Sequence, residues 1–132
     1  MVKTLVSLRN DIYMFLLGAS VYYLLEILWR GHSHVSMFIL GGFCGLMLYK
    51  LASLPYPVIF LACMGCVGIT AAELVCGLLV NKVLKLHVWD YSDVPLNVLG
   101  QICPSYSFLW FVLSFMAITI LQAFVLPYVT HT

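Results

Sequence analysis

The sequence predicts an all-α protein, a polytopic bundle of about four transmembrane helices with an interfacial or re-entrant segment before the last helix. Of its 132 residues, 64% are hydrophobic and 8% are charged, with a mean hydropathy of +1.07. Soluble domains carry far more charge. The apolar residues form four runs, each long enough for the roughly 20-residue helix that crosses a bilayer. None of the runs has the two-residue alternation of a barrel strand, so helices are expected.

The runs give four expected spans, residues 12–29, 36–54, 58–80 and 108–128. We expect residues 1–132 to form a single transmembrane domain. No small-residue cleavage pattern follows the first run, so it is expected to stay as a helix rather than act as a signal peptide. Pro55 and Pro57 lie in the second connection, which is short. The third connection, about 81–107, is long and rich in polar residues, so it is the segment in which function is expected.

Glycines recur at helical spacing in the second and third runs: Gly41, Gly42, Gly45, Gly65, Gly68 and Gly77. Small residues let helix backbones approach closely in lipid, where no hydrophobic drive brings helices together. We expect these glycines to pack helices of one chain against each other. An interface between copies of the chain is the alternative.

The charge of the chain excludes nucleic acid as a partner and says little about which side of the membrane the termini lie on. The net charge is +1, from six basic and five acidic residues, which is too little for a nucleic-acid surface. Basic residues at the ends of spans mark the cytoplasmic side. Three lie on the side of the termini and three on the other, namely Lys3, Arg9 and Lys50 against Arg30, Lys82 and Lys85. We expect cytoplasmic termini.

An even number of spans places the first and third connections on the same side of the membrane. Glu26 and Arg30 end the first run four residues apart, which suits an ion pair on one helix face. Glu73, Gly77 and Asn81 repeat at intervals of four and form a line rising toward the same side. A carboxylate inside a span costs about 2.5 kcal/mol or more unless it is compensated. Glu73 is therefore either a substrate-binding or proton-coupling group, or a structural anchor bonded to Arg30, a tryptophan or the backbone.

The two connections on this side complete a set of candidates for substrate binding or proton coupling. The set is Glu26, Arg30, His34, Glu73, Asn81, Trp89, Asp90, Tyr91, Asn97 and Gln101. A half-helix in the third connection would present Asn97 and Gln101 inward and act as a lid over Glu73. The alternative for the aromatic residues, Trp110 included, is an interfacial belt at the ends of the spans.

Other chemistry has weaker support. His32, His34 and His87 have ligand nitrogens, but their spacing matches no zinc signature. We expect no metal and no cofactor. Cys63 and Cys66 form a Cys-x-x-Cys pair, which would suit a thiol oxidase, yet they lie toward the opposite end of the third span from the polar residues.

Four sequence blocks carry a resemblance to a known family: EILWRGHSH at 26–34, GG at 41–42, ELVCG at 73–77 and HVWDYSDVPLNVLGQIC at 87–103. With these blocks the chain resembles the bacterial family labelled putative ABC-transporter type IV, or CmpB, from Glu26 to Trp110. The resemblance implies a transporter permease, multi-pass, in a bacterial inner membrane. No Gly-Lys-Thr or Gly-Lys-Ser motif is present, so any ATPase would be a separate chain.

Three functions follow as expectations. The first is a permease or permease subunit with a polar cavity at one membrane face, which would need a homo-oligomer or a partner subunit to enclose a path. The second is a membrane enzyme acting on a lipid or prenyl-linked substrate, in which Arg30 would bind phosphate. The third is a structural assembly subunit.

Overall fold

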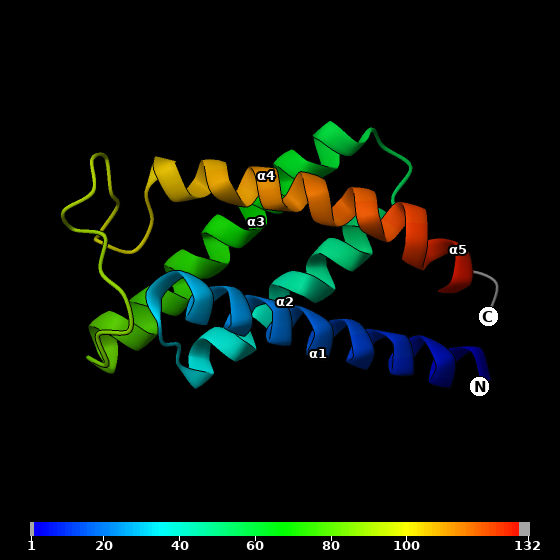
Figure 1. Ribbon diagram of the computed structural model, residues 1–132, viewed down its shortest axis with the longest axis horizontal. Helices are drawn as coiled ribbons and strands as arrows, with labels where there is room; N and C mark the ends of the chain where they lie inside the picture. Colours follow the sequence, from blue (N-terminus) through cyan, green and yellow to red (C-terminus); the bar gives the residue numbers. More distant parts are fainter. Residues whose placement is uncertain (1, 130–132) are drawn as a thin grey trace.

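The chain forms a bundle of four long helices. The computed structural model describes residues 2–129 (Figure 1). Its long helices are α1 (Val2–Arg30), α2 (Val35–Ala52), α3 (Val58–Gly77) and α4 (Pro104–Ile120). Helix α3 continues as the π-helical segment η1 (Leu78–Val83), and α4 continues through η2 (Leu121–Val125) into α5 (Leu126–Val129). No strand occurs within 2–129, which confirms the predicted all-α class.

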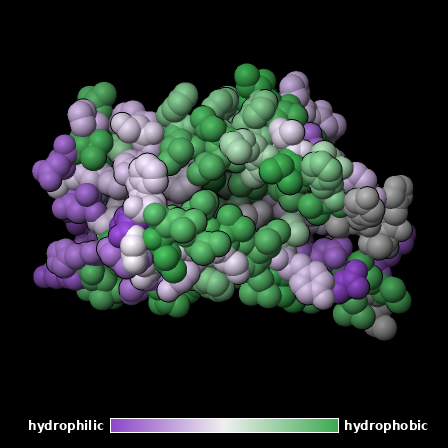
Figure 2. All heavy atoms as spheres, viewed as in Figure 1, coloured by the Kyte–Doolittle hydropathy of each residue, from purple (hydrophilic) through white to green (hydrophobic). Residues whose placement is uncertain are grey.

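Each of the four helical segments is long and apolar enough to cross a membrane. They are Val2–Arg30, Val35–Ala52, Val58–Val83 and Pro104–Val125. Figure 2 shows apolar side chains over the middle of one face and hydrophilic ones gathered at the two ends of the long axis. This distribution is that of a protein whose middle lies in hydrocarbon and whose ends lie at the two interfaces. The chain is a multi-pass membrane protein.

Glycine allows α1 and α2 to approach closely. A Cβ atom added to Gly18 of α1 would lie 2.7 Å from the Cα of Gly45, and one added to Gly41 would collide with Tyr22. One added to Gly42 would lie 2.5 Å from the Phe15 ring. Gly18 is a packing glycine in the first run, outside the glycine pattern of the second and third runs. Close backbone approach of this kind gives dispersion contacts, the main source of helix association in lipid.

The remaining packing glycines lie on α3. An added Cβ on Gly65 would lie 2.8 Å from Leu48 of α2 and 3.0 Å from the Ser114 hydroxyl of α4. One on Gly68 would collide with the thioether of Met47. These neighbours belong to the same chain, so the spacing of small residues serves contacts within the bundle.

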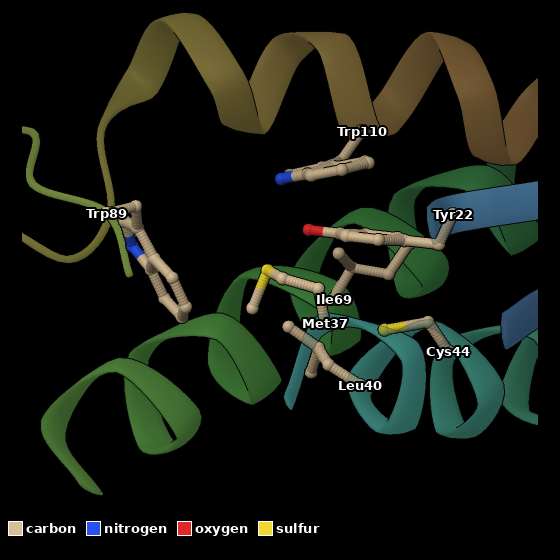
Figure 3. Close-up of a cluster of buried hydrophobic side chains, with 7 residues drawn as sticks. All are labelled: Tyr22, Met37, Leu40, Cys44, Ile69, Trp89 and Trp110. Atoms are coloured by element: carbon tan, nitrogen blue, oxygen red, sulfur yellow. The ribbon is translucent and has the colours of Figure 1, made fainter. Parts of the chain in front are cut away.

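The core divides into two clusters along the bundle. The larger lies toward the α3–α4 connection and joins residues from all four helices and the connection: Tyr22, Met37, Leu40, Cys44, Ile69, Trp89 and Trp110 (Figure 3). The smaller lies toward the termini and consists of Ala52, Leu61 and Ile118. The larger cluster is rich in aromatic rings, and it is the one that surrounds Glu73.

Two helices begin earlier than their apolar runs predict. Helix α1 starts at Val2, not near residue 12, because no proline or glycine interrupts the more polar first three turns. Helix α4 starts at Pro104, not at Phe108, because proline at the first helical position is favourable. Part of the segment assigned to the third connection is therefore helical.

The remaining connection, residues 84–103, contains turns and no half-helix. Lys85, His87, Leu96 and Leu99 have positive φ, between 52° and 60°, and such residues do not continue a right-handed helix. A lone bridge pairs Val98 with Ile102. In Figure 1 this segment covers one end of the bundle, so it lies over the helix ends as a cap.

Candidate functional site

The end of α1 carries the expected ion pair and joins it to the α3–α4 connection. Glu26 Oε2 lies 2.6 Å from Arg30 Nε, at the i, i+4 spacing that the sequence indicates. Arg30 Nη1 also donates a hydrogen bond to the carbonyl of Val88, at 3.0 Å. Because this second bond spans 58 positions of the chain, Arg30 fixes the connection to α1 as well as neutralising Glu26.

Glu73 is a buried carboxylate on α3, 3% exposed. The indole N–H of Trp110 on α4 donates a hydrogen bond to its Oε1. The side chain of Tyr91, from the connection, is a second hydrogen-bonding neighbour. Both partners are neutral. The ion pairs among residues 2–129 join Glu26 to Arg30 and Asp11 to Lys50, so no basic side chain of the described chain pairs with Glu73.

The π-helical segment η1 turns Asn81 into the protein. Asn81 Nδ2 donates to Gln101 Oε1 at 2.7 Å, and Asn81 Oδ1 accepts from the backbone N–H of Val88 at 2.7 Å. The indole N–H of Trp89 donates to the carbonyl of Gln101 at 3.0 Å. Asn81, Trp89 and Gln101 are all buried, so these three residues, which we name the connection lock, hold the connection over the helix ends.

Gly77 leaves the space that the connection lock needs. An added Cβ on Gly77 would lie 2.5 Å from Gln101 Oε1 and 2.9 Å from the Trp89 ring. The line of residues Glu73, Gly77 and Asn81 is therefore continuous in space. Its three members differ in role: the first lines a cavity, while the other two receive the connection.

A cavity of about 210 Å³ lies among α1, α3, α4 and the connection. Its wall includes the charged side chains of Glu26, Arg30 and Glu73. Six aromatic residues also line it: Tyr22, Trp29, Trp89, Tyr91, Tyr106 and Trp110. We name this space the Glu73 cavity. Most of its wall is aromatic or aliphatic, and the charged atoms are few.

The aromatic rings of the Glu73 cavity are ordered in two stacks. Tyr91 of the connection and Tyr106 of α4 stack with ring centroids 4.7 Å apart and planes 8° apart. Tyr22 of α1 and Trp110 of α4 stack at 5.4 Å and 17°. Figure 3 shows the Tyr22 hydroxyl and the Trp110 nitrogen pointing the same way, toward the side on which Trp89 lies. Burial raises the pKa of the Tyr91 hydroxyl above its usual value, as does the nearby Glu73, so this group is a neutral donor at ordinary pH.

Five of the ten candidates line the cavity: Glu26, Arg30, Glu73, Trp89 and Tyr91. Asn81 and Gln101 belong to the connection lock behind it. The other three build local structure. His34 caps α2, with its Nδ1 accepting from the Ser36 N–H at 3.1 Å. Asn97 Nδ2 donates to the Val94 carbonyl at 2.9 Å, inside the connection.

Asp90 is exposed at the surface of the connection and accepts a hydrogen bond from the backbone N–H of Ser92 at 2.9 Å. This bond lowers the pKa of the Asp90 carboxyl below its usual value. Asp90 does not line the cavity. Its role in the structure is to shape a turn.

Sequence reasoning missed Tyr22 and Tyr106, and it placed Trp110 in an interfacial belt. The tryptophan is instead buried and donates a hydrogen bond to Glu73. A signal was present: Tyr22 precedes Glu26 by four residues and Tyr106 precedes Trp110 by four. Such spacing puts each pair on one helix face. No group of three His, Cys, Asp or Glu side chains within residues 2–129 is placed to hold a metal.

Comparison with known protein families gives a match over most of the chain. The family model described as Putative ABC-transporter type IV matches residues 13–132. Searches of curated proteins and of solved structures found no match. The matched segment includes every residue that lines the Glu73 cavity and all three members of the connection lock.

Proposed function

Since the chain belongs to the Putative ABC-transporter type IV family, we propose that it is a permease subunit that binds its solute in the Glu73 cavity. The observation that carries the proposal is a buried carboxylate that lines a cavity and has only neutral hydrogen-bond partners. An ionisable group inside a span is costly and marks a solute or proton path by default. A structural anchor would need no cavity beside it.

Binding is better supported than catalysis. Two groups that could act as general bases, His34 and Asp90, are engaged in a helix cap and a turn, away from the cavity. The guanidinium that would bind a lipid phosphate, on Arg30, is paired with Glu26. A structural subunit would explain the glycine contacts, but it leaves the cavity without a role.

Transport by four helices needs further subunits. The Glu73 cavity lies at one end of the bundle, and the smaller core cluster fills the other. A path across the membrane therefore requires a second copy or a partner membrane subunit. An ATPase in a separate chain would drive it, as the family name suggests. We place the protein in a bacterial inner membrane with cytoplasmic termini, so the cavity opens at the outer face.

The test is solute flux in proteoliposomes. Charge movement on a solid-supported membrane would be recorded for a panel of cations, anions and neutral solutes, with the protein alone and with any ATPase that co-purifies. We expect a saturable signal for at least one solute, and its loss in Glu73→Gln. Asp11→Asn is the control, because Asp11 pairs with Lys50 on the surface at the other end of α1. Absence of flux across the whole panel, from folded protein with its co-purified partners, would overturn the proposal.

Sidedness has its own test. A membrane-impermeant thiol reagent applied to intact cells should label Asp93→Cys in the connection and spare Thr4→Cys near the start of α1, both in a background with the natural cysteines replaced. The reverse pattern would place the termini outside and the Glu73 cavity at the cytoplasmic face.

A further inference from the structure

The Glu73 cavity does not end at the charged residues. A second hollow, of about 350 Å³, runs along the bundle between α1 and α4. It shares Tyr22, Leu25, Trp110 and Leu113 with the Glu73 cavity. The two spaces therefore adjoin: the Glu73 cavity is charged and lies toward one membrane face, and the second hollow is apolar and lies toward the middle of the bilayer. We name the second hollow the α1–α4 groove.

The α1–α4 groove exists because α1 and α4 are not packed against each other. Helix α1 packs on α2, and α4 packs on α3, while α1 and α4 are not among the closely packed pairs. In Figure 1, α1 and α4 both run along the long axis of the bundle, α4 along its upper side and α1 along its lower side. The groove wall is apolar apart from the Tyr22 hydroxyl and the Trp110 nitrogen, with residues such as Leu17, Met116 and Ala117. A chain of methylene groups suits such a wall.

The charged side chains of the Glu73 cavity favour a ligand with a cationic head group. Arg30 neutralises Glu26, which leaves the carboxylate of Glu73 without a cation from the protein. No lysine or histidine side chain lies in the described wall. A cationic ligand would supply the missing charge, whereas a phosphate would meet an excess of carboxylate. Bilayer phospholipids, which carry phosphate, are therefore poor occupants.

The aromatic wall points to the same ligand. Six aromatic rings line the cavity, and the faces of such rings attract cations, with quaternary ammonium groups as the best-known case. The volume suffices: a cavity of about 150 Å³ holds benzene, and the Glu73 cavity has about 210 Å³. A trimethylammonium group is similar to benzene in size.

From these observations we propose that the protein binds a single-chain organic cation, with an ammonium head among the aromatic rings beside Glu73 and an alkyl tail along the α1–α4 groove. The proposal names the substrate class of the proposed permease and rests on that function for the use of the cavity. A helix from a second copy would fill the groove but would leave Glu73 without a cation. The wall that the groove shares with the charged cavity favours the amphiphile.

The tryptophans of the chain provide a direct test. The sequence has three tryptophans, and Trp29, Trp89 and Trp110 all line the Glu73 cavity. Trp89 and Trp110 are buried, whereas Trp29 is 74% exposed, so in a Trp29→Phe background intrinsic tryptophan fluorescence reports on this cavity. The probe is dodecyltrimethylammonium brominated near its head, because bromine quenches nearby indoles. It would be titrated into the full-length protein in neutral maltoside micelles, beside an uncharged isostere in which carbon replaces the nitrogen.

We expect saturable quenching by the cation and none by the isostere. Binding by Glu73→Gln should be at least about tenfold weaker, because the charge pair with the head is lost. Glu73→Asp, which keeps the charge, should retain most of the affinity. Circular dichroism and thermal unfolding would establish that both variants are folded. Equal affinities for Glu73→Gln and the natural protein, or equal binding of the isostere, would overturn the proposal.

A second pair of variants tests the groove. Ala117→Phe fills the groove wall and should weaken binding of the long-chain probe while leaving tetramethylammonium binding unchanged. Val112→Phe, at an exposed position of the same helix outside the groove, should alter neither. If the protein is a dimer in micelles and the probe does not quench its tryptophan fluorescence, a second copy occupies the groove. This result would overturn the proposal.

The two proposals fail separately. Saturable cation binding without flux of any solute would keep the ligand class and remove the permease. Flux of other solutes, with no cation binding, would keep the permease and remove the ligand class.

Discussion

Tyr22 and Trp110 stack with their ring centroids 5.4 Å apart, although their helices, α1 and α4, are not closely packed. Both rings line the Glu73 cavity and the α1–α4 groove, so the stack lies where the two adjoin. One of its rings also donates the hydrogen bond that Glu73 accepts. The position of the buried carboxylate is therefore coupled to the contact between α1 and α4.

Trp110→Phe should keep an aromatic ring at this position and remove the N–H donor to Glu73. The phenyl ring preserves a stack with Tyr22, but Glu73 loses its indole partner. We expect a loss of about 1–3 kcal/mol in the free energy of unfolding, the cost of a buried polar group left without its hydrogen bond. Reversible unfolding in mixed micelles measures it. Trp29→Phe is the control, since Trp29 is 74% exposed. Equal losses for both variants would mean that the bond to Glu73 contributes nothing.

Asn81→Ala should release the connection. The substitution removes the acceptor for Val88 and the donor to Gln101. We expect amide hydrogen exchange in residues 84–103 to become at least about tenfold faster, since each of the two lost buried bonds costs about 1–3 kcal/mol. The matched control is Asn10→Ala on α1, near the other end of the bundle. Unchanged exchange in the connection would show that other contacts hold it.

Gly45→Ala should force α1 and α2 apart. The added Cβ would lie 2.6 Å from the Cα of Gly18, and a backbone atom cannot move aside as a flexible side chain can. We expect destabilisation of about 1–3 kcal/mol, the usual cost of overpacking. Ser20→Thr adds the same methyl group on an exposed part of α1 and should have little effect. The prediction is wrong if the two variants unfold alike.

Asp90 should make one turn of the connection sensitive to acid. Its folded pKa is lowered by the Ser92 N–H, so the carboxylate favours the turn fully above the unfolded pKa, about 3.9. That contribution is lost as the pH falls through the folded value. The Ser92 amide resonance should therefore shift in the acid range in the natural protein and in Asp93→Asn, but not in Asp90→Asn. A shift that persists in Asp90→Asn would assign it to another group.

The four helices could be predicted because each apolar run is long enough to span a bilayer, and hydrocarbon allows few other structures. The pairing of Glu26 with Arg30 also follows from spacing along one helix. Both inferences concern one helix at a time. They need no knowledge of how the helices are arranged.

The connection and the aromatic wall could not be predicted in the same way. Non-glycine residues such as Lys85 and Leu96 adopt positive φ, which depends on contacts with distant residues and not on local preference. The stack of Tyr22 on Trp110 depends on the angle between α1 and α4, which the sequence pattern does not contain. For the same reason His34 and Asp90 were grouped with the cavity although each forms local structure instead.

The π-helical segment Leu78–Val83 has a consequence for variation in chain length. A π turn holds one residue more than an α turn, so it is equivalent to a single-residue insertion in an α-helix. Because the wide turn absorbs this extra residue, deleting one residue within it would restore α-helical geometry and leave the two flanking parts in nearly the same rotation. The same deletion in the regular part of α3 would rotate the flanking parts by about 100° relative to each other. In descendants of this sequence, single-residue deletions that keep Asn81 should therefore be tolerated better within Leu78–Val83 than within Val58–Gly77.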